Sequence, residues 1–295
     1  MSRSRRLILT DKAMRVLMIG AASTSILIVT LIFLFLFREA GPFVREPGLG
    51  SLWDSQWIPV SFQEEHFGLG PLLAGSALVT VLAMLVTVPV SVLVAIYIAE
   101  LARPVEREVL KPFIEILASI PSVVLGFFGL VVLAPLLKEA FGLSSGLTAL
   151  TGALLLALMA IPTVISISED ALNSVPIALK NASLALGASH LQTIFRVTLP
   201  AALPGIVAAV MLGIGRVIGE TMAVLMVTGN SAIVTFSPLE SVRTMTATIA
   251  AEMGEVPFGS VHYQALFWIG IALLFITFLL NLVAQGVLKK YGMMK

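Results

Sequence analysis

The sequence predicts an all-α integral membrane protein with six transmembrane helices. Of its 295 residues, 58% are hydrophobic and 12% are charged, whereas a soluble domain carries about 25% charged residues. Uncharged stretches of about 20 residues, the length that crosses a hydrocarbon core as a helix, recur six times. Cysteine is absent, which excludes disulfides, thiolate metal sites and cysteine nucleophiles. We therefore expect one membrane domain and no soluble domain.

The first predicted span covers residues 16–37 and follows a short N-terminal segment, 1–15. The stretch is longer than the hydrophobic region of a signal peptide, and no small-residue cleavage site follows it. We therefore expect the segment to remain in the membrane. The next residues, 38–70, are rich in Pro, Gly and Trp and form a predicted outer loop.

The other five spans form a predicted permease core at residues 71–288, followed by a short tail, 289–295. Charged residues or Gly and Ser separate them. Their predicted ranges are 71–99, 112–137, 147–168, 204–228 and 263–288. The fifth span differs from the others because Arg216 and Glu220 interrupt it. In the outer segment before the sixth span, residues 241–252 predict a short helix at the membrane surface.

Positive charges predict the orientation of the spans, because translocation disfavours Lys and Arg near span ends. Thirteen of them fall on one side, at Arg3, Arg5, Arg6, Lys12, Arg15, Arg103, Arg107, Lys111, Lys180, Arg196, Lys289, Lys290 and Lys295. The opposite loops hold Arg38, Arg45, Lys138 and Arg243. Both termini and the loops after spans two and four are therefore expected in the cytoplasm.

The cytoplasmic loop 169–203 has the pattern of two short helices joined by a tight turn. Gly187 ends the first helix, because glycine adopts the left-handed conformation cheaply. Ser189 and Gln192 form the S-x-x-Q capping box of the second helix, which is expected to end at Pro200. Such a hairpin suits a groove of another protein, and an ordinary amphipathic hairpin at the membrane surface would show the same pattern.

The spacing from Gly187 to Pro200, G-x9-[IV]-x-L-P, resembles the EAA loop of bacterial ABC-importer permeases. The resemblance implies the type I ABC-importer permease fold and a docking site for a separate ATPase. Where that loop usually reads Glu-Ala-Ala, this chain has Asn-Ala-Ser, which removes one expected charge contact. The implied coupling residues are Asn181, Ala182, Ser183, Gly187, Val197, Leu199 and Pro200.

A longer stretch, Gly187 to Asn230, resembles the PstC family of phosphate-specific transport permeases. The segments FIEILASIPSVVLGFFGL in the third span and RTMTATIAAEMGE in the outer loop are similar to the same family, so that the resemblance runs from about Pro71 to the C-terminus. It implies import of inorganic phosphate across the bacterial inner membrane by alternating access. The implied partners are a PstA-like sister permease in a heterodimer, a PstB-like ATPase dimer that binds ATP, and an extracytoplasmic PstS-like phosphate-binding protein.

Arg216 and Glu220 are candidate residues of the substrate path, because ionisable residues inside a span are costly and mark functional sites. At i,i+4 on one helical face they are also expected to pair, and a purely structural ion pair remains an alternative. The guanidinium matches the oxygens of an oxyanion. Gly215 and Gly219 form a G-x-x-x-G motif that predicts close helix packing, either within this chain or against a partner permease.

Several other activities have no motif in the sequence. No G-x-x-x-x-G-K-[ST] loop occurs, so ATP hydrolysis is assigned to a partner and no cofactor to this chain. The three histidines lack metal-ligand spacing, no catalytic residue is assigned, and the charge pattern indicates no nucleic-acid binding. A permease for sulfate, molybdate or phosphonate is the alternative interpretation. A secondary transporter or channel fits less well, because it would not need a docking hairpin.

Overall fold

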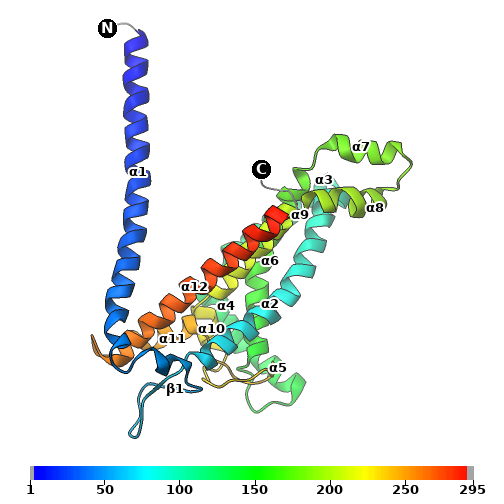
Figure 1. Cartoon of the computed structure of the whole chain (residues 1–295). Coiled ribbons are helices and arrows are strands. Elements are labelled where there is room, and N and C mark those ends of the chain that lie inside the picture. Colours follow the sequence, from blue (N-terminus) through cyan, green and yellow to red (C-terminus); the bar gives the residue numbers. More distant parts are fainter. Residues whose placement is uncertain (1–2, 291–295) are drawn as a thin grey trace.

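The computed structural model describes residues 3–290, so parts of the predicted N-terminal segment and tail lie outside the described residues. Within this range, six helical stretches are long and apolar enough to cross a membrane, in agreement with the predicted number. They are Met14–Val44, Gly70–Leu101, Ser122–Phe141, Ala149–Asn173, His190–Gly219 and Val261–Gly286. The chain is therefore helical throughout its membrane part (Figure 1).

Three helices form the centre of the molecule: α2 (Gly70–Ile96), α6 (Ala149–Asn173) and α9 (Leu199–Gly219). α6 packs against both of the others. The approach is close because a Cβ on Gly213 of α9 would lie 2.7 Å from Val164 of α6. Loss of that glycine would push the two helices apart. Gly213 therefore sets the spacing at the core, although the sequence pattern did not single it out.

Helix α1 (Arg3–Ala40) stands apart from this core and meets α12 (Val261–Lys290) near its own C-terminal end (Figure 1). The indole N–H of Trp268 donates to the Ala40 carbonyl at 2.9 Å, and Phe35 packs edge-on against Phe267. The hydrophobic stretch of α1 is otherwise exposed along its length. Its apolar surface must therefore be covered by lipid or by another chain.

The third span begins later than the sequence predicted. Residues 104–119 form a separate helix, α3 (Pro104–Ser119), that has no buried residue. The chain then breaks at Ile120, whose backbone is extended, because the residue before a proline disfavours the α conformation. The span continues as α4 (Ser122–Phe128), a π-helical turn η4 (Gly129–Leu133) and α5 (Ala134–Phe141).

A small folded cap closes the end of the molecule that carries β1 (Figure 1). It contains the turns η1 (Gly41–Val44) and η2 (Leu49–Trp53) and the hairpin β1 (Trp57–Ile58) with β2 (His66–Phe67). The hairpin is antiparallel, with Trp57 opposite Phe67. Its aromatic residues share one hydrophobic cluster with the start of α12, so the segment expected as an outer loop is packed onto the spans.

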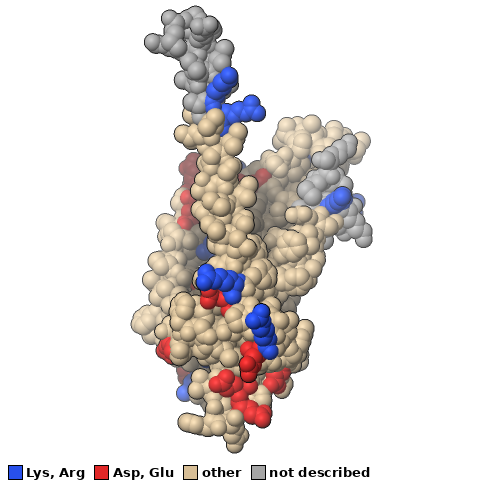
Figure 2. All heavy atoms as spheres, turned by 60° about the vertical axis from the view of Figure 1, so that its left-hand side comes forward, with Lys and Arg blue, Asp and Glu red and all other residues tan. Residues whose placement is uncertain are grey.

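The helix predicted at residues 241–252 is present as α11 (Met245–Glu252). Thr244 caps it by accepting the N–H of Ala247, which accounts for its later start. Figure 2 shows Asp and Glu side chains gathered at the end of the molecule that holds the cap. The N-terminal end of α1, α3 and the predicted coupling loop lie at the opposite end (Figure 1).

Candidate functional site: a broken span and a docking loop

The fifth span is broken at Glu220, and the expected i,i+4 pairing of Arg216 with Glu220 is therefore wrong. Helix α9 ends at Gly219, Glu220 has an extended backbone with ψ 134°, and the short helix α10 follows at Met222–Val227. Glu220 Oε1 instead accepts the backbone N–H groups of Thr221, at 3.1 Å, and Ala223, at 3.3 Å. The carboxylate therefore binds the first turn of α10, and among the described residues it forms no ion pair with Arg216.

Arg216 lies on an exposed face of α9. Its Nη1 donates to the hydroxyl oxygen of Thr163 on α6 at 3.1 Å. Among the described residues, no carboxylate oxygen lies within 4.0 Å of its guanidinium nitrogens. Arginine presents five N–H donors, so most of them remain available to a ligand. Sequence reasoning missed Thr163, because its contact with Arg216 spans 53 positions.

A small cavity of about 10 Å³, lined by both polar and apolar side chains, lies beside Glu220. Thr246 donates its hydroxyl to the Glu220 carbonyl at 2.8 Å, and Ser76 accepts the backbone N–H of Met245 at 3.0 Å. The cavity has room for about one water molecule and none for a phosphate ion. The hydroxyl of Thr246 therefore stabilises the broken backbone at Glu220, and that of Ser76 stabilises the start of α11.

Gly215 and Gly219 are exposed, and a Cβ on either would meet no described atom within 4 Å. The G-x-x-x-G motif therefore does not pack against another helix of the described chain. The glycines of α9 that do pack against α6 are Gly213, already described, and Gly205, where a Cβ would overlap Ala171. Packing of Gly215 and Gly219 against a partner chain stays a prediction.

The loop at residues 169–203, called the docking loop from here on, contains the turn predicted at Gly187. Helix α7 (Ile177–Ala185) ends in a Schellman motif: the N–H of Gly187 bonds to the Leu184 carbonyl, and the N–H of Ala188 bonds to the Ser183 carbonyl. Gly187 has φ +87°, as its predicted role requires. The next helix, α8 (His190–Thr193), begins with the predicted capping box.

The second helix of the loop does not end at Pro200, so that expectation is wrong. α8 continues through a π-helical turn, η5 (Ile194–Thr198), directly into α9. The N–H of Leu199 reaches back five residues to the Ile194 carbonyl. This wider turn immediately precedes Pro200, which has no N–H to offer. The helix thus passes the proline, and the docking loop and Arg216 share one continuous helix.

The surface of the docking loop is largely apolar and exposed. Asn181 and Ala182 are exposed on α7, Ser183 is partly buried, and Val197, Leu199 and Pro200 lie where the π-helical turn meets α9. The exposed large apolar side chains of the loop are Ile177, Leu179, Leu184, Leu186, Leu191 and Phe195. Exposed apolar patches of this kind occur where a protein contacts another protein or the membrane.

Polar contacts that sequence reasoning missed tie the docking loop to the spans. Lys180 of α7 forms an ion pair with Glu100 at 2.6 Å, and both side chains are largely buried. Glu100 lies in η3 (Tyr97–Leu101), the π-helical turn that ends the second span. The hydroxyls of Ser183 and Thr193 lie 3.0 Å apart across the turn. The loop is therefore attached to α2 as well as to α9.

At the opposite end, Glu252 of α11 joins three elements. It accepts hydrogen bonds from the indole N–H of Trp57 and from His262 Nε2, at 2.8 Å, and pairs with Arg243. Burial by itself raises the pKa of Glu252, but the bonds from His262, Arg243 and Trp57 outweigh it and hold the pKa below the usual 4.5. An ionised Glu252 thus fastens the hairpin to α11 and α12.

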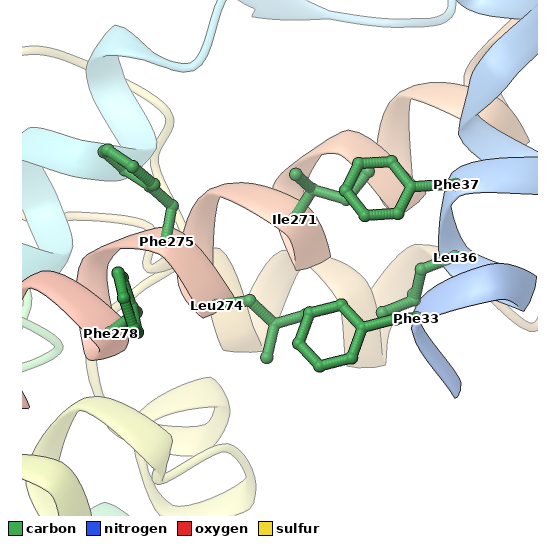
Figure 3. Close-up of a pocket in the computed structure, with 7 residues that line it drawn as sticks. All are labelled: Phe33, Leu36, Phe37, Ile271, Leu274, Phe275 and Phe278. Carbon is green, nitrogen blue, oxygen red and sulfur yellow. The ribbon is translucent and has the colours of Figure 1, made fainter. Parts of the chain in front are cut away.

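A groove of about 320 Å³ separates α1 from α12 (Figure 3). Its lining is apolar throughout and consists of Phe33, Leu36, Phe37, Ile271, Leu274, Phe275 and Phe278. An oxyanion would lose its hydration there without gaining a single hydrogen bond, at a cost of many kcal/mol. The apolar groove therefore suits acyl chains or an apolar helix and does not suit a hydrated ion.

Comparison with known proteins agrees with this architecture. Residues 91–290 match the family described as "Binding-protein-dependent transport system inner membrane component". "Probable ABC transporter permease protein YqgH" of Bacillus subtilis (strain 168) is 40% identical across 78% of this chain and 74% of that relative. "Phosphate transport system permease protein PstC" of Mesorhizobium japonicum is 32% identical across 97% of this chain and 92% of that relative.

Solved structures show the same fold at lower identity. A bacterial ABC transporter "involved in the import of the acidic polysaccharide alginate" has a chain with a TM-score of 0.60 and 17% identity, covering 96% of this chain and 98% of that one. A chain of the MetNI methionine ABC transporter has a TM-score of 0.57 and 20% identity, covering 76% of this chain and 94% of that one. The chain therefore belongs to the binding-protein-dependent transport system inner membrane components, the multi-pass inner membrane permease subunits of ABC importers.

Proposed function

We propose that this chain carries inorganic phosphate through the membrane by alternating access. The observation that carries the proposal is Arg216, a permanent cation on an exposed face of α9, immediately before the break at Glu220. Its N–H donors match the oxygens of a tetrahedral oxyanion. Relatives named as phosphate transport permeases, similar over nearly the whole chain, support phosphate as that anion.

The proposed complex contains a PstA-like sister permease, a PstB-like ATPase dimer and a PstS-like phosphate-binding protein. The exposed apolar surface of α7 and α8 supports the docking of the ATPase there. In this proposal the end that carries α7 and both termini lie in the cytoplasm, which the distribution of positive charges in the sequence supports. In this arrangement the binding protein faces the cap that contains β1.

Sulfate, molybdate and phosphonate are the alternative cargoes, because one guanidinium attracts any of these oxyanions. A secondary transporter or a channel is less supported, since nothing in those mechanisms requires a docking loop or an ATPase. The membership of this chain in a family of ABC-importer permeases favours the ATP-driven mechanism.

The test is uptake of radiolabelled phosphate by the reconstituted complex with ATP on the ATPase side. Arg216→Gln is expected to reduce uptake at least about tenfold, because it removes charge-assisted hydrogen bonds that contribute roughly 1.5–3 kcal/mol each. Arg15→Gln, on the exposed surface of α1 at the end of the molecule away from the cap, is the matched control and should transport normally. Undiminished uptake by Arg216→Gln would show that Arg216 is not part of the substrate path. Stronger competition by sulfate or phosphonate than by unlabelled phosphate would show that phosphate is not the preferred cargo.

A further inference from the structure

Helix α6 has an unusual surface for a central membrane span. Its hydrophobic window is 61% buried inside the chain, and each of its exposed residues is polar: Ser166, Asp170 and Asn173. Together with the half-buried Thr163 they follow one another at intervals of three, four and three residues. This spacing places all four on one helical face. The part of α6 nearer the docking loop therefore presents a continuous polar stripe.

Ser166 lies near the end of the predicted span 147–168 and Asp170 just beyond it, where polar side chains are solvated better by water or by another protein than by lipid. On α12 the exposed residues Phe275, Phe278 and Leu279 are apolar, and the exposed polar residues Asn281 and Gln285 follow them toward its C-terminal end. The α6 stripe must meet either water or the polar surface of another protein.

The position of Arg216 indicates that the α6 stripe meets water. Its guanidinium is bound to Thr163, the first residue of the stripe. The stripe then runs from Thr163 toward the docking loop, and Asp170 lies about 10 Å farther along the helix axis. A cation proposed to bind the anion and a row of polar groups leading away from it therefore share one open face.

We propose that Thr163, Ser166 and Asp170 line a hydrated anion path from Arg216 to the docking-loop end of the membrane. The proposal rests on the proposed transport function and extends it to residues on α6. Thr163 positions the guanidinium, and the hydroxyl of Ser166 can donate to an oxyanion. Asp170 carries the same sign of charge as the anion, so it prevents tight binding near the exit and favours release. The sister permease closes the other side of this path.

The absence of cysteine from the sequence makes a direct test possible. Ser166→Cys, in the full complex in membrane vesicles, is treated with the hydrophilic, negatively charged reagent 2-sulfonatoethyl methanethiosulfonate, and the label on this chain is quantified. Leu279→Cys is the matched control, because Leu279 is exposed and lies about as far along α12 as Ser166 does along α6, roughly 26 Å from the helix start. Val164→Cys is the buried control.

A thiol in a hydrated path ionises and reacts, whereas an apolar environment raises its pKa and suppresses the reaction. Ser166→Cys is expected to react roughly tenfold faster than either control, and phosphate should slow it. Asp170→Cys repeats the measurement if Ser166→Cys does not assemble. Reaction no faster than that of Leu279→Cys and Val164→Cys at both positions would overturn the proposal. Fast labelling that sulfate slows and phosphate does not would uphold the path and reject phosphate as cargo.

The positioning role of Thr163 has a separate readout. Thr163→Val keeps the shape of the side chain and removes the acceptor for Arg216, so KM for uptake should rise about tenfold with a much smaller change in kcat. Thr163→Ser, which restores the hydroxyl, should recover most of the loss. In an Arg216→Gln background, Thr163→Val should have no further effect. Equal loss in the Val and Ser variants, or additive losses with Arg216→Gln, would refute the positioning role.

Discussion

At the scale of single residues, Glu220 shows how a charge can be stabilised inside a broken span. Non-helical backbone at membrane depth needs polar partners or cover by protein. The carboxylate of Glu220 supplies a partner to two backbone N–H groups, and Thr246 supplies one to its carbonyl. The break and the partly buried carboxyl group of Glu220 therefore satisfy each other's hydrogen-bonding needs.

Gly187 has an equally specific role, and its replacement gives a prediction about ATPase docking. Gly187→Ala introduces no clash, because no described atom lies within 4 Å of the new Cβ, but it forces an L-residue to keep φ +87°. The left-handed conformation costs roughly 1–2 kcal/mol for such a residue. The turn between α7 and α8 should therefore loosen, and co-purification of the ATPase with the permease should decrease.

Gly187→Asn is the matched control, because asparagine adopts the left-handed conformation more readily than alanine. It should retain more of the ATPase than Gly187→Ala, and Gly187→Val should retain the least. If the three variants bound the ATPase equally well, the conformation of this turn would have no part in docking. Insertion into the membrane is checked for each variant by its yield in the membrane fraction.

The sequence predicted these local features well and the contacts between spans poorly, for a physical reason. The turn at Gly187 and the capping box at Ser189 are determined by residues within a few positions of each other. The break at Glu220 also involves Thr246, which reaches the Glu220 carbonyl only in the folded chain. The i,i+4 spacing of Arg216 and Glu220 in the sequence carries no information about such a distant contact.

At the scale of elements, the continuous helix from His190 to Gly219 connects the docking loop with Arg216. Its 30 residues span about 45 Å, and the π-helical turn before Pro200 lets it pass the proline without ending. A rotation of the loop by an ATPase would therefore be transmitted directly to the guanidinium. The expected helix end at Pro200 would have placed a hinge in this connection.

The ion pair of Lys180 with Glu100 is a second connection, from α7 to the end of the second span, and it gives a prediction about coupling. Glu100→Gln leaves the buried Lys180 without its counter-charge, a change that costs roughly 3–5 kcal/mol in buried pairs. α7 should still bind the ATPase through its exposed apolar surface. We expect less phosphate transported per ATP hydrolysed, measured in proteoliposomes that contain the full complex.

Glu108→Gln is the control for this experiment, because Glu108 is an exposed acid on the neighbouring helix α3. The exchange Glu100→Lys with Lys180→Glu should restore part of the coupling, since it restores opposite charges. An unchanged ratio of transport to hydrolysis in Glu100→Gln would show that α9 alone transmits the motion of the loop.

At the scale of the whole molecule, the number of spans could be predicted and their arrangement could not. Apolar runs of sufficient length define a span regardless of its neighbours. Because length and hydropathy do not depend on neighbours, α1 and α6 look alike in the sequence. In the structure the hydrophobic stretch of α1 is exposed, whereas that of α6 is largely buried. Burial is decided by small residues at particular contacts, such as Gly213 against Val164, and these contacts are not visible in a run of apolar residues.

The two ends of the molecule lead to the prediction on which the mechanism depends, its orientation in the membrane. The positive charges of the sequence assign the docking loop to the cytoplasm, so an impermeant maleimide should not reach that loop in spheroplasts. Leu186→Cys in the loop and Phe62→Cys in the cap replace two strongly exposed apolar residues at opposite ends. Phe62→Cys should be labelled in intact spheroplasts and Leu186→Cys after permeabilisation. The reverse labelling pattern would show the opposite orientation in the membrane. The docking loop would then be out of reach of a cytoplasmic ATPase, which would contradict ATP-driven import.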